Sequence, residues 1–267
     1  MPLLARFRAI PDKDKAALIR KLLSNGTPDF DYFYLIGLST LMATLGLLLD
    51  SGSIVIGSML IAPLMYPILG VSLGLVMTRD NTNLLTRALN TLVKSLFAGL
   101  ALSVTAAFFF GDAETYQTAE VMARTVPSHL HLLVALVAGA AVTFIMSRPE
   151  WGDTLAGVAI AVALIPPLAT IGIGIAAIAT LGLVASAVII KGATMILLLN
   201  LFGIITVAVV IFLLMNLSEK EYIATSTVKR EDEKKENEDK VVAEVAKQIS
   251  IHSETENIVV HEDIKIK

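Results

Sequence analysis

Two pairs of prolines are the residues of this sequence best placed to do chemistry, because each pair interrupts a long apolar run. Pro63 and Pro67 lie about midway along one run. Pro166 and Pro167 lie midway along another. Proline lacks an amide hydrogen and its ring clashes with the carbonyl four residues earlier, so a helix kinks or breaks there. A broken helix presents unpaired backbone groups that can bind a solute or an ion, although two kinked structural helices packed through their glycines would give the same pattern.

Three polar side chains accompany the prolines. Tyr66 lies inside the first pair, and Thr170 follows the second. Asn200 lies near the centre of the last apolar run, where its amide can bond a freed carbonyl, a solute or only a neighbouring helix. The predicted substrate-binding residues are Pro63, Tyr66, Pro67, Pro166, Pro167, Thr170 and Asn200. Ranked below them are hydroxyls that can bond back to their own helix, at Ser39, Thr40 and Thr44.

Four charged residues at the ends of apolar runs are candidate gate residues. A charge in the bilayer costs several kcal/mol unless it is paired or reaches water. We predict that Asp50 and Lys191 pair at the outer side. We predict an equivalent inner pair of Asp153 and Lys94. The alternative is that both aspartates cap helices and both lysines extend to lipid headgroups.

The composition places the chain in a membrane. Hydrophobic residues make up 55% and charged residues 17% of the 267 residues, whereas about 25% of a typical soluble chain is charged. Between Tyr32 and Thr78 the single charged residue is Asp50. This pattern excludes a soluble enzyme. The net charge of −3, without a basic patch, excludes a nucleic-acid binder, and the lack of Cys excludes a disulfide scaffold and thiolate metal sites.

We expect no enzyme activity and no cofactor. The sequence contains no HExxH and no close pair of intramembrane acids that could act as a catalyst, and its GxSxG match, Gly70–Gly74, lies inside an apolar run. His129 and His131 lie two residues apart at a membrane boundary. Without further ligands in the sequence, we interpret them as interfacial residues rather than a metal site.

Six apolar runs are long enough to cross the roughly 30 Å hydrocarbon layer as helices. They are Tyr32–Leu49, Ile54–Met77, Val93–Phe110, Leu130–Ser147, Thr154–Ala179 and a final run that reaches Met215. The final run is long for one span. We interpret it as a connecting or interfacial helix, Leu181–Ile190, followed by a span from Lys191. Two tight spans are the alternative.

The second and fifth runs match without a gap at a constant offset of one hundred residues. In this frame Gly52, Gly57, Pro67 and Gly74 pair with Gly152, Gly157, Pro167 and Gly174. Each half of the membrane region, about 31–110 and 130–215, then holds three spans. An odd number of spans forces the second half to insert upside down. The predicted fold is an all-α integral membrane protein with six transmembrane helices, arranged as two inverted three-helix repeats whose second and fifth helices are broken at proline.

Basic residues set the predicted orientation, since they favour the cytoplasmic side. With both termini inside, Arg124 is the one basic residue of the outer loops, and the inner side holds the basic N-terminal segment and the tail. Residues 1–30 then form a cytoplasmic segment with an amphipathic helix at Asp12–Leu23. Residues 31–217 form the membrane domain, and residues 218–267 a charged cytoplasmic tail, of which Ile258–Lys267 is strand-like.

The two proline segments resemble an uncharacterised hydrophobic-domain family of prokaryotic membrane proteins, domain of unknown function 389. The similarity lies in 57–68, GSMLIAPLMYPI, and in 157–168, GVAIAVALIPPL. Weaker similarity extends it over about Asp31 to Met215. The resemblance implies a prokaryotic membrane setting and supplies no substrate.

The sequence therefore favours a secondary transporter or channel-like permease for a small solute or ion, in the inner membrane, with its site between the broken helices. The lipid bilayer and the solute are the expected partners, no nucleic acid is expected, and a homo-oligomer is left open. The alternative is a membrane scaffold or sensor that acts through its cytoplasmic tail. Polar residues that line the breaks would favour transport, whereas dry packing there would favour a scaffold.

Overall fold

The computed structural model describes residues 10–26, 28–77, 82–148, 153–220 and 222–230, together with residues 233, 236, 237, 240 and 241. All regular elements within these residues are helices. The chain divides into two compact units, Met1–Thr225 and Ser226–Lys267. In the second unit the described residues are helical, and Lys240 pairs with Glu236 at 2.7 Å. The strand predicted at Ile258–Lys267 lies outside the described residues.

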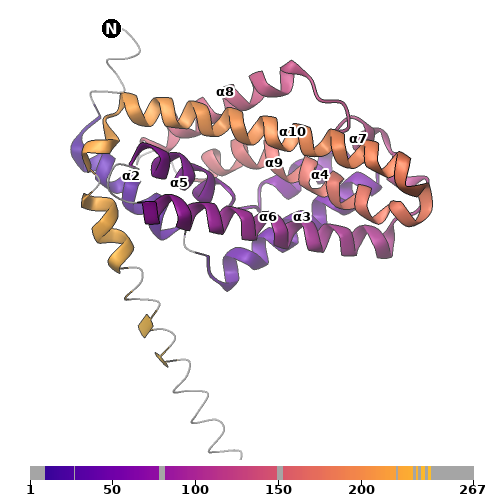
Figure 1. Cartoon of the computed structure of the whole chain (residues 1–267), viewed down its shortest axis with the longest axis horizontal. Helices are drawn as coiled ribbons and strands as arrows, with labels where there is room; N and C mark the ends of the chain where they lie inside the picture. The colour runs from indigo at the N-terminus through magenta and orange to yellow at the C-terminus, as the bar shows by residue number, and fades with distance from the viewer. Residues whose placement is uncertain are drawn as a thin grey trace, which may run out of the picture. The chain divides into compact units, whose positions relative to one another are not determined.

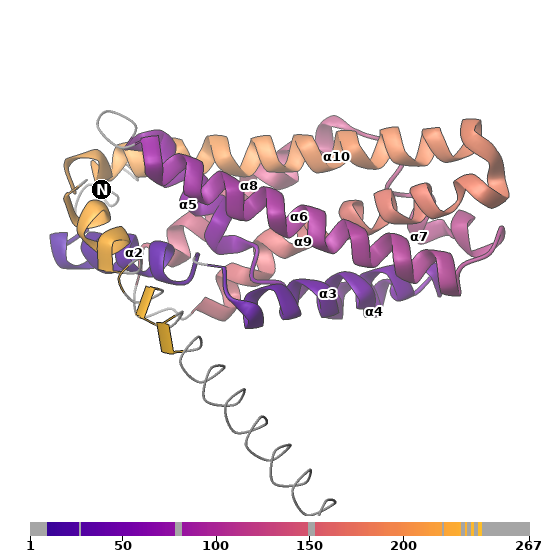
Figure 2. The same ribbon diagram turned by 60° about the horizontal axis from the view of Figure 1, so that its bottom comes forward.

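The first unit is a helix bundle (Figures 1 and 2). Its first helices are α2 (Asp12–Ser24), α3 (Phe30–Leu48), α4 (Gly52–Met59), α5 (Met65–Val76) and α6 (Thr82–Phe110). A short helix α7 (Ala119–Met122) then precedes α8 (His129–Met146), α9 (Asp153–Ala176) and α10 (Ile178–Leu214). In the middle of the bundle α9 packs against α3, α6, α8 and α10. The helix α2 packs its buried residues Leu18, Ile19 and Leu22 at one end, where it contacts α5.

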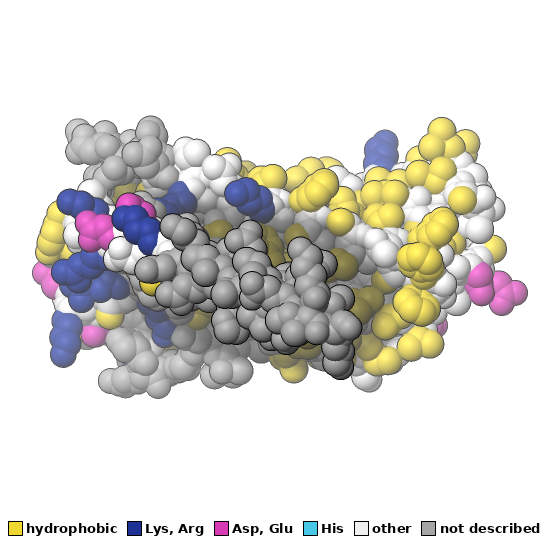
Figure 3. Space-filling model, turned by 90° about the horizontal axis from the view of Figure 1, so that it is seen from below, with side chains coloured by type: hydrophobic (Ala, Val, Ile, Leu, Met, Phe, Trp, Pro, Cys, Tyr) yellow, Lys and Arg dark blue, Asp and Glu magenta, His cyan; other side chains and the backbone are white. Residues whose placement is uncertain are grey.

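Four helices are long and apolar enough to cross a membrane: α3, α6, α8 and α10. Their outward faces carry large apolar side chains, including Phe97 and Phe109 on α6 and Val184 on α10, each more than two-thirds exposed. Figure 3 shows hydrophobic side chains over much of one face and Lys and Arg side chains gathered towards the end where α2 lies. Such a surface is suited to lipid rather than water, which indicates a membrane protein and confirms the predicted all-helical class.

The second predicted run forms two helices instead of one. The helix α4 ends at Met59 and α5 begins at Met65, with Pro63 in the connection. A helix end leaves carbonyls without intrahelical donors, and in a membrane each needs another partner. Ser39 of α3 supplies one, because its hydroxyl donates to the Ser58 carbonyl at 2.7 Å.

The break predicted in the fifth helix is not present. The helix α9 is continuous from Asp153 to Ala176, with Pro166 and Pro167 inside it. Adjacent prolines remove hydrogen bonds from a single turn, and the turns on both sides are intact. Residues 164–170 are all buried among neighbouring helices, and the Thr170 hydroxyl donates to the Pro166 carbonyl at 2.9 Å. Tertiary packing therefore keeps this proline turn helical.

The predicted division of the last run was also wrong. The helix α10 is kinked at Gly182, which has φ +79° and ψ 167°; α9 and α10 meet at one end of the bundle (Figure 2). From there the helix continues to Leu214, so Lys191 lies inside it rather than at its start. Glycine adopts positive φ without steric cost, and no proline follows it before Leu214 that would end the helix.

Candidate functional site

A cavity of about 340 Å³ lies where α4, α7, α8, α9 and α10 meet. It is lined by Met59, Glu120, Ala123, Arg124, His131, Pro166, Pro167, Ile196 and Asn200. Three predicted binding residues thus come together here: Pro166 and Pro167 from α9, and Asn200 from α10. Asn200 is 6% exposed and the prolines are buried, so they form the deep part of the cavity.

The other predicted binding residues lie elsewhere. Pro63, Tyr66 and Pro67 belong to the α4–α5 connection and the start of α5, and none of them lines the cavity. Tyr66 lies beside Gly26, close to α2. Thr170 is fully buried and bonded to its own helix. From this part of the chain the cavity is lined by Met59, the last residue of α4, instead.

An ion pair within α7 and the residues just after it forms the polar side of the cavity. Arg124 Nη1 lies 2.6 Å from Glu120 Oε2 and also donates to the Glu120 backbone carbonyl. The two side chains are only 21% and 28% exposed. A partly buried charge is costly unless it is paired. The sequence places Arg124 in a predicted outer loop, and the spacing of four residues between Glu120 and Arg124, which allows pairing on a helix, is the signal that could have identified the pair.

Two contacts, one from the end of α3 and one from the α3–α4 connection, hold α7 over the cavity. The Glu120 backbone amide donates to Asp50 Oδ1 at 2.8 Å, and the Thr118 hydroxyl donates to the Leu47 carbonyl at 2.7 Å. Asp50 itself has a positive φ of 52°. Its side chain therefore caps α7, not the helix α4 that follows it. The sequence allowed two roles for Asp50, a gate pair with Lys191 and a helix cap. These contacts match the helix cap.

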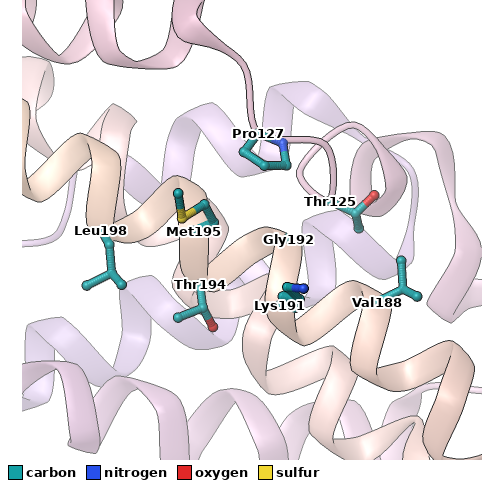
Figure 4. A pocket seen from close by; sticks show the side chains of 8 residues that line it. All are labelled: Thr125, Pro127, Val188, Lys191, Gly192, Thr194, Met195 and Leu198. Carbon is teal, nitrogen blue, oxygen red and sulfur yellow. The ribbon is translucent and has the colours of Figure 1, made fainter.

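The segment after α7 lies on α10. The Thr125 carbonyl is so close to Gly192 that a Cβ at this position would collide with it. Figure 4 shows Thr125 and Pro127 beside the helix here, with Lys191, Thr194, Met195 and Leu198 along it. These residues line a second, mainly apolar cavity of about 660 Å³. Lys191 faces this second cavity, and the described structure places it in no ion pair with Asp50.

The predicted inner gate pair is only half described. Lys94 is exposed on α6. Asp153 is the first residue of α9, but its side chain lies outside the described residues. The pairing of Asp153 with Lys94 stays a prediction.

His131 has a fixed hydrogen-bonding state at the cavity. Its Nδ1 accepts from the Ser128 backbone amide at 3.1 Å, while the Ser128 hydroxyl accepts from Leu130 at 3.2 Å. These bonds cap α8. Because Nδ1 accepts, the neutral ring carries its hydrogen on Nε2. His131 was predicted to be interfacial, whereas here it lines a polar cavity.

A buried hydroxyl chain supports α9 behind the cavity. The Thr44 hydroxyl of α3 donates to Ser103 Oγ at 2.8 Å, and Ser103 of α6 donates to the Ala169 carbonyl at 3.0 Å. Gly172 leaves room for Ser103, since a Cβ there would collide with this hydroxyl. Three helices are thereby joined within one turn of Pro166 and Pro167.

No group of three or more His, Asp and Glu residues able to hold a metal ion occurs within the described segments. The polar groups at the cavity are one carboxylate, one guanidinium, one imidazole and one amide. This set can bind a small polar solute, and it contains no Ser, Thr or Cys nucleophile for covalent catalysis.

Comparison with known proteins identifies the family. The family described as "Domain of unknown function (DUF389)" matches residues 59–228. An uncharacterised protein of Methanocaldococcus jannaschii, MJ0678, is 30% identical over 165 residues, which are 60% of this chain and 50% of that protein. The chain thus spans about half the length of the curated relative it matches, and no solved structure matches it. The match covers α5 to α10 and all the helices that form the deep part of the cavity, and the chain belongs to the DUF389 family.

Proposed function

We propose that the chain is a secondary transporter or channel-like permease for a small solute or ion, with the 340 Å³ cavity as its binding site. The observation that carries the proposal is the position of this cavity. It extends from the ion pair of Glu120 on α7 and Arg124 just after it to the proline turn inside the helix α9. A scaffold has no need of a polar cavity at this depth, and polar groups within membrane helices commonly mark transport pathways.

The proposal assigns six spans to the chain. Four are the long helices α3, α6, α8 and α10. The fifth is α9, and the sixth is the pair α4 and α5, in which eight and twelve residues together reach the length of one span. On this assignment the N-terminus and the tail lie in the cytoplasm of an inner membrane, and α7 lies on the outer side as a lid over the cavity.

Exchanged packing supports an inverted repeat. If α3, α4–α5 and α6 correspond to α8, α9 and α10, then each third helix packs against the second helix of the other half. This is the case, because α6 contacts α9 and α10 contacts α5. A two-fold axis in the membrane plane relates such contacts in pairs.

Glycine contacts repeat in the same way. Gly37 of α3 adjoins Leu102 of α6, as Gly139 of α8 adjoins Ile204 of α10, with an offset of 102 residues for both partners. Close approach at small residues is a common way for membrane helices to pack. Shared close contacts of corresponding helices support a common origin for the two halves.

The second helices also have corresponding glycine contacts, with offsets of 100 residues for the glycines and 104 for their partners. Gly74 of α5 adjoins Leu85 of α6, and Gly174 of α9 adjoins Ile189 of α10. The second helices nevertheless differ, since α4 and α5 are separated around Pro63 and α9 is continuous through Pro166. Two copies of one unit in different conformations are what alternating access requires, because exchange of the two conformations would close the cavity on one side and open it on the other.

Uptake into liposomes tests the proposal. Purified full-length protein is reconstituted and supplied with labelled anions, cations and neutral solutes, with protein-free liposomes as the reference. We expect saturable uptake of at least one class, and loss of that uptake in Asn200→Leu but not in Thr105→Ala, because Thr105 is an exposed residue bonded only to its own helix. Uptake no faster than in protein-free liposomes, or equal uptake by Asn200→Leu, would overturn the proposal and favour a scaffold or sensor.

A further inference from the structure

We propose that the 340 Å³ cavity binds a small organic carboxylate, with Arg124 and His131 holding the carboxylate and the proline turn of α9 holding a short apolar body. The inference rests on the proposed function for its physiological role. The binding itself depends only on the cavity.

The first observation is the donor capacity of Arg124. A guanidinium has five N–H groups in one plane. The hydrogens of Nη1 are directed to the Glu120 carbonyl and to Glu120 Oε2. Across the residues described, no other acceptor is bonded to this side chain. Three N–H groups, on Nη2 and Nε, are left at a residue that lines the cavity, and such a fork matches the two oxygens of a carboxylate.

The second observation is the orientation of His131. Its Nδ1 is occupied by the Ser128 amide, so Nε2 carries the hydrogen that remains available. Within the described part of the chain, Nε2 has no recorded partner. The cavity thus offers donors from both Arg124 and His131, and a ligand with closely spaced acceptor oxygens satisfies both.

Apart from Asn200, the remainder of the lining is apolar and selects the ligand's other end. Met59, Ile196, Pro166 and Pro167 present no side-chain donor or acceptor. An inorganic oxyanion would leave its outer oxygens against these groups at a desolvation cost. A carboxylate with a short hydrocarbon body places oxygen at Arg124 and carbon at the prolines. The division of the lining therefore favours an organic acid over phosphate or sulfate.

Glu120 lowers the affinity of the cavity for anions. Its carboxylate already neutralises Arg124, so an incoming anion competes with it for the guanidinium. Asp50 is the other acid near this segment, and it is bonded to the Glu120 backbone amide. Removal of the Glu120 charge alone should therefore strengthen anion binding, whereas removal of the Arg124 charge should weaken it.

Calorimetry on the full-length protein in nanodiscs of neutral lipid tests the inference. The probes are propionate, propanol, propylammonium and inorganic phosphate. We expect propionate to bind most tightly, its dissociation constant to rise about tenfold to a hundredfold in Arg124→Gln, and to fall severalfold in Glu120→Gln. Lys191→Gln is the matched control, since it removes a positive charge from α10 beside the other cavity and should leave binding unchanged.

A second variant covers the case in which Arg124→Gln does not fold. Ala123 is exposed and lines the cavity, so Ala123→Trp fills the cavity while it leaves both charges in place, and it should abolish propionate binding. Tightest binding of propylammonium, propanol or phosphate, or propionate binding that neither variant affects, would overturn the inference. Uptake of a non-anionic solute would overturn the substrate class and leave the proposed function intact. Propionate binding without uptake of any solute would overturn the proposed function and leave the binding inference intact.

Discussion

At the scale of single residues, the contact between Gly192 and the Thr125 carbonyl fixes the segment after α7 against α10. The contact joins backbone to backbone, so no side-chain rotation can relieve a clash there. Thr125 is buried and its hydroxyl bonds to the Met122 carbonyl at 2.7 Å, which limits how far its backbone can move. Glycine is required here because there is no space for a Cβ. Its backbone conformation is helical and would accept any residue.

We expect Gly192→Ala to destabilise the protein by about 1–3 kcal/mol, the usual cost of overpacking. Gly57→Ala is the control, because a Cβ there would meet only the flexible end of the Met42 side chain and alanine favours a helix by about 0.5–1 kcal/mol over glycine. Thermal unfolding in detergent measures both. A melting temperature of Gly192→Ala equal to or above that of Gly57→Ala would show that the segment does not rest on α10.

The residues of the cavity show how far sequence alone could lead. Asn200 and the second proline pair were identified because polar and proline residues are conspicuous inside an apolar run. Glu120 and Arg124 were missed because they lie outside the runs, whereas His131 lies at the start of one and was interpreted as interfacial. Their position over the cavity depends on contacts with Asp50 and Gly192, which lie about 70 residues away in the chain on either side. No local pattern predicts a contact of that kind.

At the scale of elements, α7 has only four residues and is held by tertiary bonds. Isolated helices this short are unstable in water. Its N-terminal amides donate to the side chains of Asp50 and Thr118. The bond to Asp50 offsets the conformational cost of the positive φ of that residue.

Substitutions at Asp50 separate the capping role from the predicted gate role. Asp50→Asn keeps an acceptor oxygen and tolerates positive φ, whereas Asp50→Ala loses both. If the residue acts as a cap, we expect Asp50→Asn to resemble the wild type and Asp50→Ala to lose about 0.5–2 kcal/mol of local stability. Hydrogen exchange of the Glu120 amide measures this. A gate would instead make Asp50→Asn as defective in uptake as Asp50→Ala, since both remove the charge.

The connection between α6 and α7 carries a pH-sensitive turn. Backbone amides of Thr115 and Glu114 donate to Asp112 Oδ1, each at 3.0 Å, and the Thr115 hydroxyl donates at 3.1 Å. These bonds favour the carboxylate and lower the pKa of Asp112 below its usual value of 3.8, with the Thr115 amide as the largest cause. A carboxyl whose pKa falls on folding stabilises the fold above its unfolded pKa, and this contribution is lost as the pH drops through the folded value.

We therefore expect the Glu114 and Thr115 amides to be better protected from exchange in the wild type than in Asp112→Asn at neutral pH. The asparagine keeps an acceptor oxygen and removes the charge, so the difference isolates the charge. The difference between the two proteins should shrink as the pH falls below 3.8, the ordinary pKa of the carboxyl, and should vanish once the pH is below the lowered pKa of Asp112. A difference that persisted at lower pH would contradict this explanation.

Element boundaries were predictable where hydropathy changes sharply. The predicted runs Tyr32–Leu49 and Leu130–Ser147 differ from α3 and α8 by at most two residues at each end. The helix α6 begins at Thr82, well before the predicted Val93. The prediction missed its first turns because they contain polar residues such as Arg87. The position of the turn at Gly182 was missed because this glycine lies in an uninterrupted apolar run.

At the scale of the whole membrane unit, the proposed inverted repeat predicts a difference between its halves rather than identity. The cavity lies beside the continuous helix α9, and the interrupted pair α4–α5 contributes only Met59 to it. If the interruption marks the closed half and the continuous helix the open half, the structure corresponds to a state open under α7. The Asn200 end of the cavity should then be accessible from the outer side alone.

Cysteine labelling tests this assignment, and the natural absence of Cys makes single-cysteine variants unambiguous. Ile196 lines the cavity and is 2% exposed, whereas its neighbour Leu197 is 8% exposed and does not line it. A membrane-impermeant thiol reagent added outside should label Ile196→Cys and spare Leu197→Cys, although the latter residue has the larger exposed fraction. Since accessibility to the reagent depends on a water path and not on exposure to lipid, this order of reactivity is specific to the cavity. Faster labelling of Leu197→Cys, or labelling of Ile196→Cys only from the cytoplasmic side, would contradict an outward-facing state, because a path from α7 to the proline turn could not then exist.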